Sequence, residues 1–418
     1  MAEAGTSSLA GRVAFKYPGF GLFLSARWFV VASLEMQSVA VGWQIYEITH
    51  RPLDLGLPGL AQFLPGVLLF LVSGQTADRF ERRKVLFACY AGFATCSGLL
   101  FYSALHGVRN VHAIYAVMLL LGVVRSFNGP ATRAILPQFV PEEHLPNAVA
   151  WGSSTFQSAT ILGPSVGGFI YALSRGPSAV YATSMTLSAA AMLSMLWVRP
   201  KSKPIVREPI RMATVLAGIE YVWKKKIILG LISLDLFAVL LGGAVALLPA
   251  YARDILNTGP WGLGLLRCAS GVGAGAMAIF FAYRPLRRRT GATMLWCVAG
   301  FGVFTILFGI SRNFYFSLFA LVLVGASDMV SVIIRGVMIQ VATPDEMRGR
   351  VNAVDMVFIG ASNELGAFES AATAQWLGTV PAVVLGGIGT LIVTALWAWG
   401  FPEMRKADRL TGEGSAGI

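Results

Sequence analysis

Charged residues are scarce in this chain of 418 residues. Asp, Glu, Lys and Arg together make up 13% of it, while apolar residues make up 56%. A soluble domain carries about 25% charged residues. The apolar residues also gather in runs of about 20, the length that crosses a bilayer as a helix. These features exclude an ordinary soluble domain and predict a polytopic membrane protein.

Histidine and cysteine are also rare, with four of each. The histidines stand outside the apolar runs or at their ends, and no His-Glu-x-x-His or Gly-x-Ser-x-Gly motif occurs. The cysteines lie within apolar runs without paired spacing, as expected of small core residues: Cys89, Cys96, Cys268 and Cys297. No phosphate-binding Gly-x-x-x-x-Gly-Lys-Ser/Thr run is present. We therefore expect no enzyme activity, no metal site, no cofactor and no use of ATP.

Twelve apolar runs predict an all-α integral membrane fold. The first run contains Arg27 and Glu35 and is too long for a signal peptide, so we expect it to remain as a helix. The predicted spans are 19–45, 55–76, 84–106, 111–136, 147–173, 178–198, 227–251, 260–283, 291–311, 314–341, 350–377 and 380–401. Most of the 33 Lys and Arg residues fall in loops on the side of the two termini, which places both termini in the cytoplasm. The basic surplus therefore reflects topology, and we expect no nucleic-acid partner.

A long polar loop divides the chain into two halves of six spans. It begins Pro-rich, and the amphipathic stretch after Pro209 predicts a helix on the membrane surface. A weak repeat supports the division, because VPEEHLPNAVAW follows span four and TPDEMRGRVNAVDM follows span ten. The predicted segments are a tail (1–18), a six-helix bundle (19–198), a linker (199–226), a second six-helix bundle (227–401) and a tail (402–418). Duplicated halves are a recurrent plan of transporters, with the substrate site between them.

The turn after span two, GQTADRFERRK, combines small residues with dense charge. One interpretation is a solvated basic loop that obeys the positive-inside rule. Its order resembles the Gly-x-x-x-Asp-Arg-x-Gly-Arg-Arg signature of the major facilitator superfamily, with Glu81 where that family usually has Gly. The resemblance implies a cytoplasmic latch between the two halves. The residues that we assign to the latch are Gly74, Asp78, Arg79, Arg82, Arg83, Arg348 and Arg350. Gly74 is expected to let span two approach a neighbouring helix closely. The matching turn of the second half, FAYRPLRRRTG, has no acid.

Span four contains LGVVRSFNGPATRAILP, in which Arg125, Asn128 and Gly129 fall on one helix face. A charge at membrane depth is costly, so Arg125 should face the protein interior or a wet cavity. It is either a structural Arg bound to helix carbonyls or, as the resemblance to the exporter pattern Arg-x-x-Gln-Gly implies, a residue of proton coupling.

Span five contains ILGPSVGGFIYAL. Its small residues permit close helix approach, and its proline should kink the span. Generic packing of small residues is one interpretation. The fuller pattern resembles the antiporter motif of major-facilitator exporters, with Ala159 in place of the usual leading Gly. We assign to this motif Gly163, Pro164, Gly167 and Gly168, and the motif favours export over uptake.

Several ionisable residues lie inside the predicted spans. Glu35 is the first candidate for a carboxylate that takes up and releases a proton, the alternative being a static buried pair. Asp328 and Arg335 share one helix face, and SNELGAFES supplies Glu364 and Glu369 from either a cavity lining or a small-residue seam. The candidate coupling and buried charges are thus Glu35, Arg125, Asp328, Arg335, Glu364 and Glu369. The remaining charges within spans are Arg27, Asp235, Arg267, Asp355.

The wider pattern resembles the enterobactin-exporter-like branch of the superfamily, also called transmembrane secretion effectors. FNGPATRAILPQFVP, TPDEMRGRVNAV and SNELGAFES carry this resemblance. It implies a proton-coupled exporter of a small amphipathic drug or siderophore-like metabolite in a bacterial inner membrane. We expect a small-molecule substrate, protons and the lipid bilayer as partners of a monomer. An importer or sensor with the same fold is the alternative, and a membrane-embedded enzyme is a third interpretation that the missing motifs disfavour.

Overall fold

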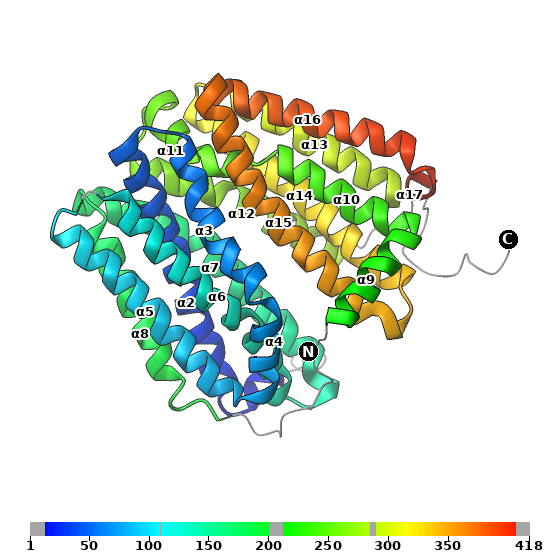
Figure 1. Cartoon of the computed structure of the whole chain (residues 1–418), viewed down its shortest axis with the longest axis horizontal. Coiled ribbons are helices and arrows are strands. Elements are labelled where there is room, and N and C mark those ends of the chain that lie inside the picture. Colours follow the sequence, from blue (N-terminus) through cyan, green and yellow to red (C-terminus); the bar gives the residue numbers. More distant parts are fainter. Residues whose placement is uncertain (1–12, 109, 200–211, 285–289, 407–418) are drawn as a thin grey trace, which may run out of the picture. The chain divides into compact units, whose positions relative to one another are not determined.

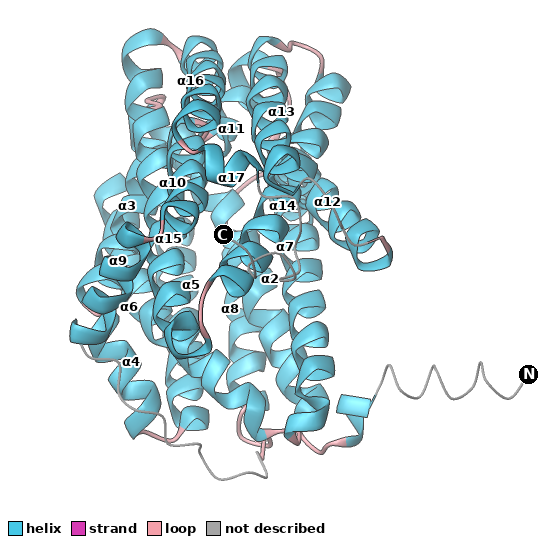
Figure 2. Cartoon of the chain, turned by 90° about the vertical axis from the view of Figure 1, so that its right-hand side faces the viewer, coloured by secondary structure: helices cyan, strands magenta, loops and turns pink. Residues whose placement is uncertain are grey.

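The computed structural model describes residues 13–108, 110–199, 212–284 and 290–406. In these residues the chain is helical and contains no strand (Figure 2). The chain forms two compact units: the first comprises Met1–Gln44 and Leu64–Ile210, and the second comprises Ile45–Phe63 and Arg211–Ile418. The segment 45–63, which the sequence assigned to the first bundle, thus packs with the second unit.

The first unit is built from long helices that are joined by short turns (Figure 1). Its helices are α2 (Phe20–Thr49) as far as Gln44, α4 (Phe70–Arg79), α5 (Arg82–Leu105), α6 (Val111–Ile135), α7 (Leu145–Ser174) and α8 (Ser178–Ser194), with the short turns η1 (Val13–Lys16), η2 (Leu136–Gln138) and η3 (Glu142–His144). Buried side-chain pairs tie α2 to its neighbours. Ser97 on α5 donates to Gln37 at 2.6 Å, and Tyr181 on α8 donates to Gln44 at 2.6 Å. Such bonds hold helices in register where packing alone is weakly specific.

The second unit contains the last turn of α2, most of α3 and the helices of the C-terminal half. Its elements are α3 (Leu53–Leu68) as far as Phe63, α9 (Met212–Lys224), α10 (Lys226–Leu241), η4 (Ala244–Leu247), α11 (Leu248–Ala250), η5 (Tyr251–Ile255), α12 (Pro260–Tyr283), α13 (Thr290–Ile310), α14 (Phe314–Ala342), α15 (Asp345–Leu377), α16 (Thr379–Gly400) and α17 (Pro402–Lys406). Its core gathers buried aliphatic residues from α10, α13, α14 and α15, among them Leu234, Val298 and Ile334. The helix predicted after Pro209 corresponds to α9.

Local sequence explains where several helices begin. α6 and α14 both start at an asparagine whose side chain accepts from a free backbone amide of the first turn. Asn110 accepts from the amide of His112 at 3.0 Å, and Asn313 accepts from that of Phe316 at 3.1 Å. Side-chain caps of this kind satisfy donors that the helix itself leaves unpaired. The predicted run 260–283 coincides with α12.

Two of the predicted spans are broken helices. The run predicted over 55–76 is interrupted at Leu69, although the amide of Leu69 still donates to the carbonyl of Pro65 at 2.8 Å. The run predicted over 227–251 ends its first helix at Leu241, because Gly242 and Gly243 follow. A Cβ at Gly243 would lie 2.7 Å from the backbone oxygen of Gly366, so this break lets the chain approach α15 closely.

In the described residues, seven helices are long and apolar enough to cross a membrane: Arg82–Leu105, Val111–Gln138, Lys226–Ile255, Pro260–Tyr283, Thr290–Ile310, Phe314–Ala342 and Thr379–Gly400. The helices α2, α7 and α15 are equally long, but polar residues lower their hydropathy. The all-α membrane class is therefore confirmed. The count of twelve spans, the bounds of the two bundles and the cytoplasmic termini stay predictions.

Candidate functional site

The predicted latch turn lies between α4 and α5. Arg83 donates two hydrogen bonds to the end of α8, to the carbonyls of Met195 at 2.8 Å and Leu196 at 2.7 Å. Arg82 is buried beside it. Arg83 thus supplies donors to carbonyls that α8 leaves unpaired at its C-terminus.

Asp78 and Gly74 are two further latch residues, both on α4. The side chain of Asp78, on the last turn of α4, lies outside the described part of the structure. A Cβ at Gly74 would meet no described atom within 4 Å, so the expected close approach is not made with the described residues. The expectation was wrong because a small residue permits contact without requiring it. Residues 285–289 of the matching second turn also lie outside the described residues.

The start of α15 shows a similar arrangement in the second unit. Arg348 donates from Nε to the carbonyls of Gln340 at 3.0 Å and Thr343 at 3.2 Å, which lie at the end of α14. The backbone of Arg350 contacts α9, where a Cβ at Gly218 would lie 2.9 Å from the Arg350 carbonyl oxygen. Arg83 and Arg348 therefore both secure a helix end within their own unit. Their role in a latch stays a prediction.

The predicted antiporter motif forms a close seam with α2. A Cβ at Gly163 would lie 2.7 Å from Cβ of Glu35, and one at Gly167 would lie 2.8 Å from Cα of Met36. Both glycines are buried, as are Pro164 and Gly168. The close approach predicted from the spacing is confirmed, and it places Glu35 beside the motif. The sequence alone could not select Glu35 as the residue that Gly163 faces.

Arg125 and Arg27, two arginines inside predicted spans of the first unit, are less buried than Arg82. Arg125 is exposed on α6, whereas Asn128 buries its Oδ1 atom without a hydrogen-bond partner in the described residues. Arg27 on α2 places its guanidinium 5.8 Å from the ring centre of Phe156 on α7. A cation over an aromatic face is a favourable contact that reduces the cost of charge at this depth.

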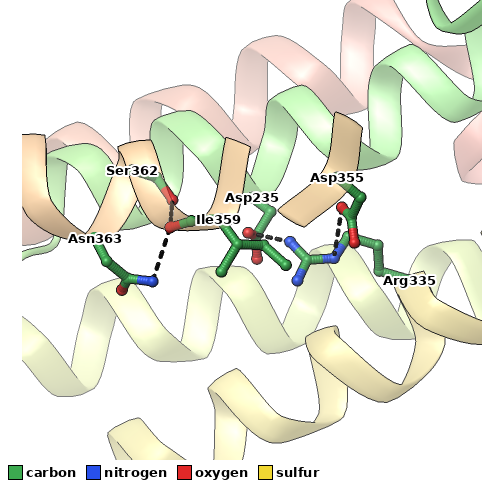
Figure 3. Close-up of polar contacts among 6 residues, drawn as sticks. All are labelled: Asp235, Arg335, Asp355, Ile359, Ser362 and Asn363. Carbon is green, nitrogen blue, oxygen red and sulfur yellow. Dashed lines mark hydrogen bonds and ion pairs between the residues drawn. The ribbon is translucent and has the colours of Figure 1, made fainter. Parts of the chain in front are cut away.

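A buried ion cluster joins three helices of the second unit. Arg335 on α14 pairs with Asp235 on α10, and its Nε lies 3.7 Å from Oδ1 of Asp355 on α15. Figure 3 shows the guanidinium between the two carboxylates. The side chains of Arg335 and Asp235 are only 4% and 8% exposed, so each needs the other to offset its desolvation. The sequence identified all three as charges within spans, but it could not show that Arg335 pairs with Asp235, a residue far from it in the chain.

Several polar side chains of α15 form hydrogen bonds within the helix itself. Ser362 and Asn363 both donate to the carbonyl of Ile359, at 3.0 and 2.9 Å (Figure 3). Thr373 donates to Glu369 at 2.8 Å, one helical turn away. Glu364 faces the segment 45–63, where its carboxylate contacts the position of Gly59.

The sequence did not predict the contacts that the segment 45–63 makes with the second unit. Tyr46, at the end of α2, donates a hydrogen bond to Asp254 in η5. A Cβ at Gly56 on α3 would lie 2.8 Å from Cα of Phe368 on α15. No sequence pattern links residues 46 and 254, although a small residue at 56 is a weak sign of close approach. These contacts explain why 45–63 packs with the second unit.

Apolar helices that carry ionisable groups, in two helical units, are typical of a membrane transport protein. Comparison with known proteins gives the family. The sequence profile of the transmembrane secretion effectors matches residues 19–413, and the chain belongs to this family of major facilitator superfamily transporters. It is a multi-pass protein of the inner membrane.

The relatives and the solved structures agree with this assignment. Enterobactin exporter EntS of Shigella boydii serotype 4 is 26% identical over 397 residues, which cover 93% of each chain. EntS of Escherichia coli O81 has the same identity and coverage. A bacterial homologue of the human lysosomal transporter Spinster has the same fold, with a TM-score of 0.73 and 12% identity over 93% of this chain and 98% of its own. A D-xylose–proton symporter has a TM-score of 0.69 and 13% identity over 92% and 98%.

Proposed function

We propose that the chain is a proton-coupled exporter of a small amphipathic organic molecule that works by alternating access. The observation that carries the proposal is the seam between α7 and α2. There the glycines of a motif resembling that of antiporters press against the helix turn of Glu35. A carboxylate at membrane depth is costly unless it has a task or a partner. Protonation of Glu35 would remove a charge beside Gly163, and we infer that this change alters the contact between the two helices.

The membrane arrangement in this proposal has twelve spans and cytoplasmic termini, with six-helix bundles over 19–198 and 227–401. Matching devices in the two halves support it. Asparagine caps start both α6 and α14, and Arg83 and Arg348 each secure a helix end. Rocking of two such halves about a shared site would expose the cargo to each side in turn. The latch residues would gate this motion.

The cargo class follows from the relatives. Proteins that are 26% identical over 93% of the chain are named enterobactin exporters. We infer a siderophore-like or drug-like molecule, carried by a monomer in exchange for protons. Since cargo can change at this level of identity, enterobactin serves as the first probe rather than as the conclusion.

Everted membrane vesicles containing the protein test the proposal. Enterobactin uptake into the vesicles should depend on an imposed proton gradient and stop when an ionophore collapses it. Glu35→Gln should abolish the pH dependence of this uptake. Glu47→Gln, the same change at an exposed position of α2, is the matched control. Transport that continues without the gradient, or accumulation in right-side-out vesicles only, would contradict the proposed coupling or direction.

If enterobactin is not moved, a growth screen identifies the cargo class. A strain lacking the gene should become sensitive to the compounds that the protein exports. Antibiotics, dyes and iron-chelating metabolites should be compared, and the strain complemented with the wild-type or Glu35→Gln protein. Sensitivity restored equally by both would remove Glu35 from the coupling mechanism.

A further inference from the structure

The start of α2 lies between the end of α6 and the start of α7 in the first unit. Phe23 of α2 stacks on Phe139, which follows α6 and η2, with the ring centres 5.0 Å apart. Phe15, which precedes α2, packs edge-on against Trp151 of α7, also at 5.0 Å. One helical turn after Phe23, α2 carries Arg27. Aromatic packing on both sides therefore fixes the position of this arginine.

The guanidinium of Arg27 lies against α7 without an acidic partner. Its Cζ is 5.8 Å from the ring centre of Phe156, and a Cβ at Gly152 would lie 3.0 Å from its Nη1. Among the described residues, no acid forms an ion pair with Arg27. Glu35, on the same helix, lies about 12 Å further along the helix axis. The aromatic face lowers the cost of this half-buried charge but does not neutralise it.

A second positive charge adds to that cost. Arg133, near the end of α6, lies close enough for its guanidinium to repel that of Arg27, and the phenol of Tyr90 on α5 also acts on the Arg27 charge. Two like charges that are partly withdrawn from water raise the free energy of the folded state. Arg133 is exposed in the structure, so a ligand can reach the pair. Charges placed at such a cost within a predicted span indicate a functional site.

We propose that Arg27, Arg133 and Phe156 form a subsite for an acidic group of an aromatic cargo, so that the molecule carried is an organic anion. The planar guanidinium of Arg27 can donate two parallel hydrogen bonds to a carboxylate while its face stays on the Phe156 ring. Phe156 is 43% exposed and offers an apolar surface to the aromatic part of the cargo. The bound anion offsets the repulsion between the two arginines.

This inference rests on the proposed function, because it assigns a charge to the cargo of the proposed exporter. Its test is nevertheless separate, since binding at equilibrium needs neither a proton gradient nor a direction of transport. Gradient-driven transport of enterobactin, without binding of an aromatic anion at Arg27, would remove this subsite alone. Binding at Arg27 without gradient-driven transport would count against the proposed function alone.

Thermal unfolding of the purified full-length protein in a neutral detergent at pH 7 tests the subsite, because a ligand that binds the folded state raises its stability. The probe is 2-naphthoate, and 2-naphthamide has nearly the same shape without the charge. Phosphatidylglycerol is tested separately, because a lipid phosphate is another source of an acidic group.

The variants change one property of the subsite at a time. Arg27→Gln removes the charge, Arg27→Lys keeps the charge but loses the planar pair of donors, and Phe156→Leu removes the ring. Arg175→Gln is the matched control, because it makes the same change at an exposed arginine of the same unit, directly after α7.

Wild type and Arg175→Gln should show a saturable rise in unfolding temperature with 2-naphthoate and none with 2-naphthamide. Arg27→Gln should raise the 2-naphthoate concentration that gives half of this rise by about tenfold, the loss of hydrogen bonds to a charged group, and Arg27→Lys should fall between. Phe156→Leu should raise it by about threefold, the loss of one aromatic contact, and it serves where Arg27→Gln does not fold.

Equal 2-naphthoate responses of wild type, Arg27→Gln and Phe156→Leu would overturn the proposal, as would equal responses to the two naphthyl compounds. A saturable rise with phosphatidylglycerol that Arg27→Gln abolishes, without any response to 2-naphthoate, would also overturn it, because the subsite would then bind a lipid headgroup rather than cargo.

Discussion

Replacing Gly167 with alanine tests the seam between α7 and α2. The added Cβ would lie 2.8 Å from Cα and 3.0 Å from the carbonyl oxygen of Met36. Both are backbone atoms of a helix, so neither can rotate away as the end of a side chain can. The two helices must move apart, or the Cβ must remain in a repulsive contact.

The size of the effect follows from two opposing contributions. Overpacking by one methyl group in a tight interior costs about 1–3 kcal/mol. Alanine favours the helix over glycine by up to about 1 kcal/mol. We therefore expect the Gly167→Ala change to lower the free energy of unfolding by about 1–2 kcal/mol. The same substitution in open space should give only the gain.

Gly336 on α14 provides that comparison, because a Cβ there would meet no atom of the described residues within 4 Å. Thermal unfolding of the two purified variants measures the difference. Gly167→Ala should unfold at a lower temperature than wild type, whereas Gly336→Ala should unfold at the same or a higher temperature. If both variants were as stable as each other, the close contact of α7 with α2 would be refuted.

Three further predictions concern charged side chains. Arg335→Met should destabilise the protein by about 3–5 kcal/mol in thermal or denaturant unfolding, because it leaves Asp235 buried without its partner. Adding Asp235→Asn should recover part of this loss. Additive effects of the two substitutions would contradict the pairing. Arg83→Gln should lower the free energy of unfolding by about 1–3 kcal/mol, because the carbonyls at the end of α8 lose two charged donors. Proteolytic cleavage near residue 196 should become faster. Unchanged cleavage would contradict this role of Arg83. Lys224 donates a hydrogen bond to Glu220 and thereby lowers the pKa of that carboxyl. Any stabilisation by the pair is therefore present above the ordinary pKa of Glu220 and is lost as pH falls through the lowered pKa. Because both side chains are exposed, Glu220→Gln should leave the unfolding temperature at pH 7 unchanged, and a clear drop would refute this.

Local sequence properties predicted much of the helical framework. Apolar runs of membrane length predicted α12 at its observed bounds and most other helices within a few residues. Glycine spacing in span five predicted close approach, which Gly163 and Gly167 make with α2. The same reasoning was wrong at Gly74, where no atom of the described residues lies within 4 Å of the Cβ position. The absence of a side chain permits a contact, but only the position of another helix produces one.

The sequence by itself determined that this is an apolar, helical membrane chain with costly charges inside its helices, because hydrophobicity, helical spacing and charge are local properties. Tertiary structure alone decided that Arg335 pairs with Asp235 and that Tyr46 bonds Asp254. These pairings join residues far apart in the chain. They depend on which helices pack together, and that choice reflects the summed free energy of many contacts rather than any one segment's pattern.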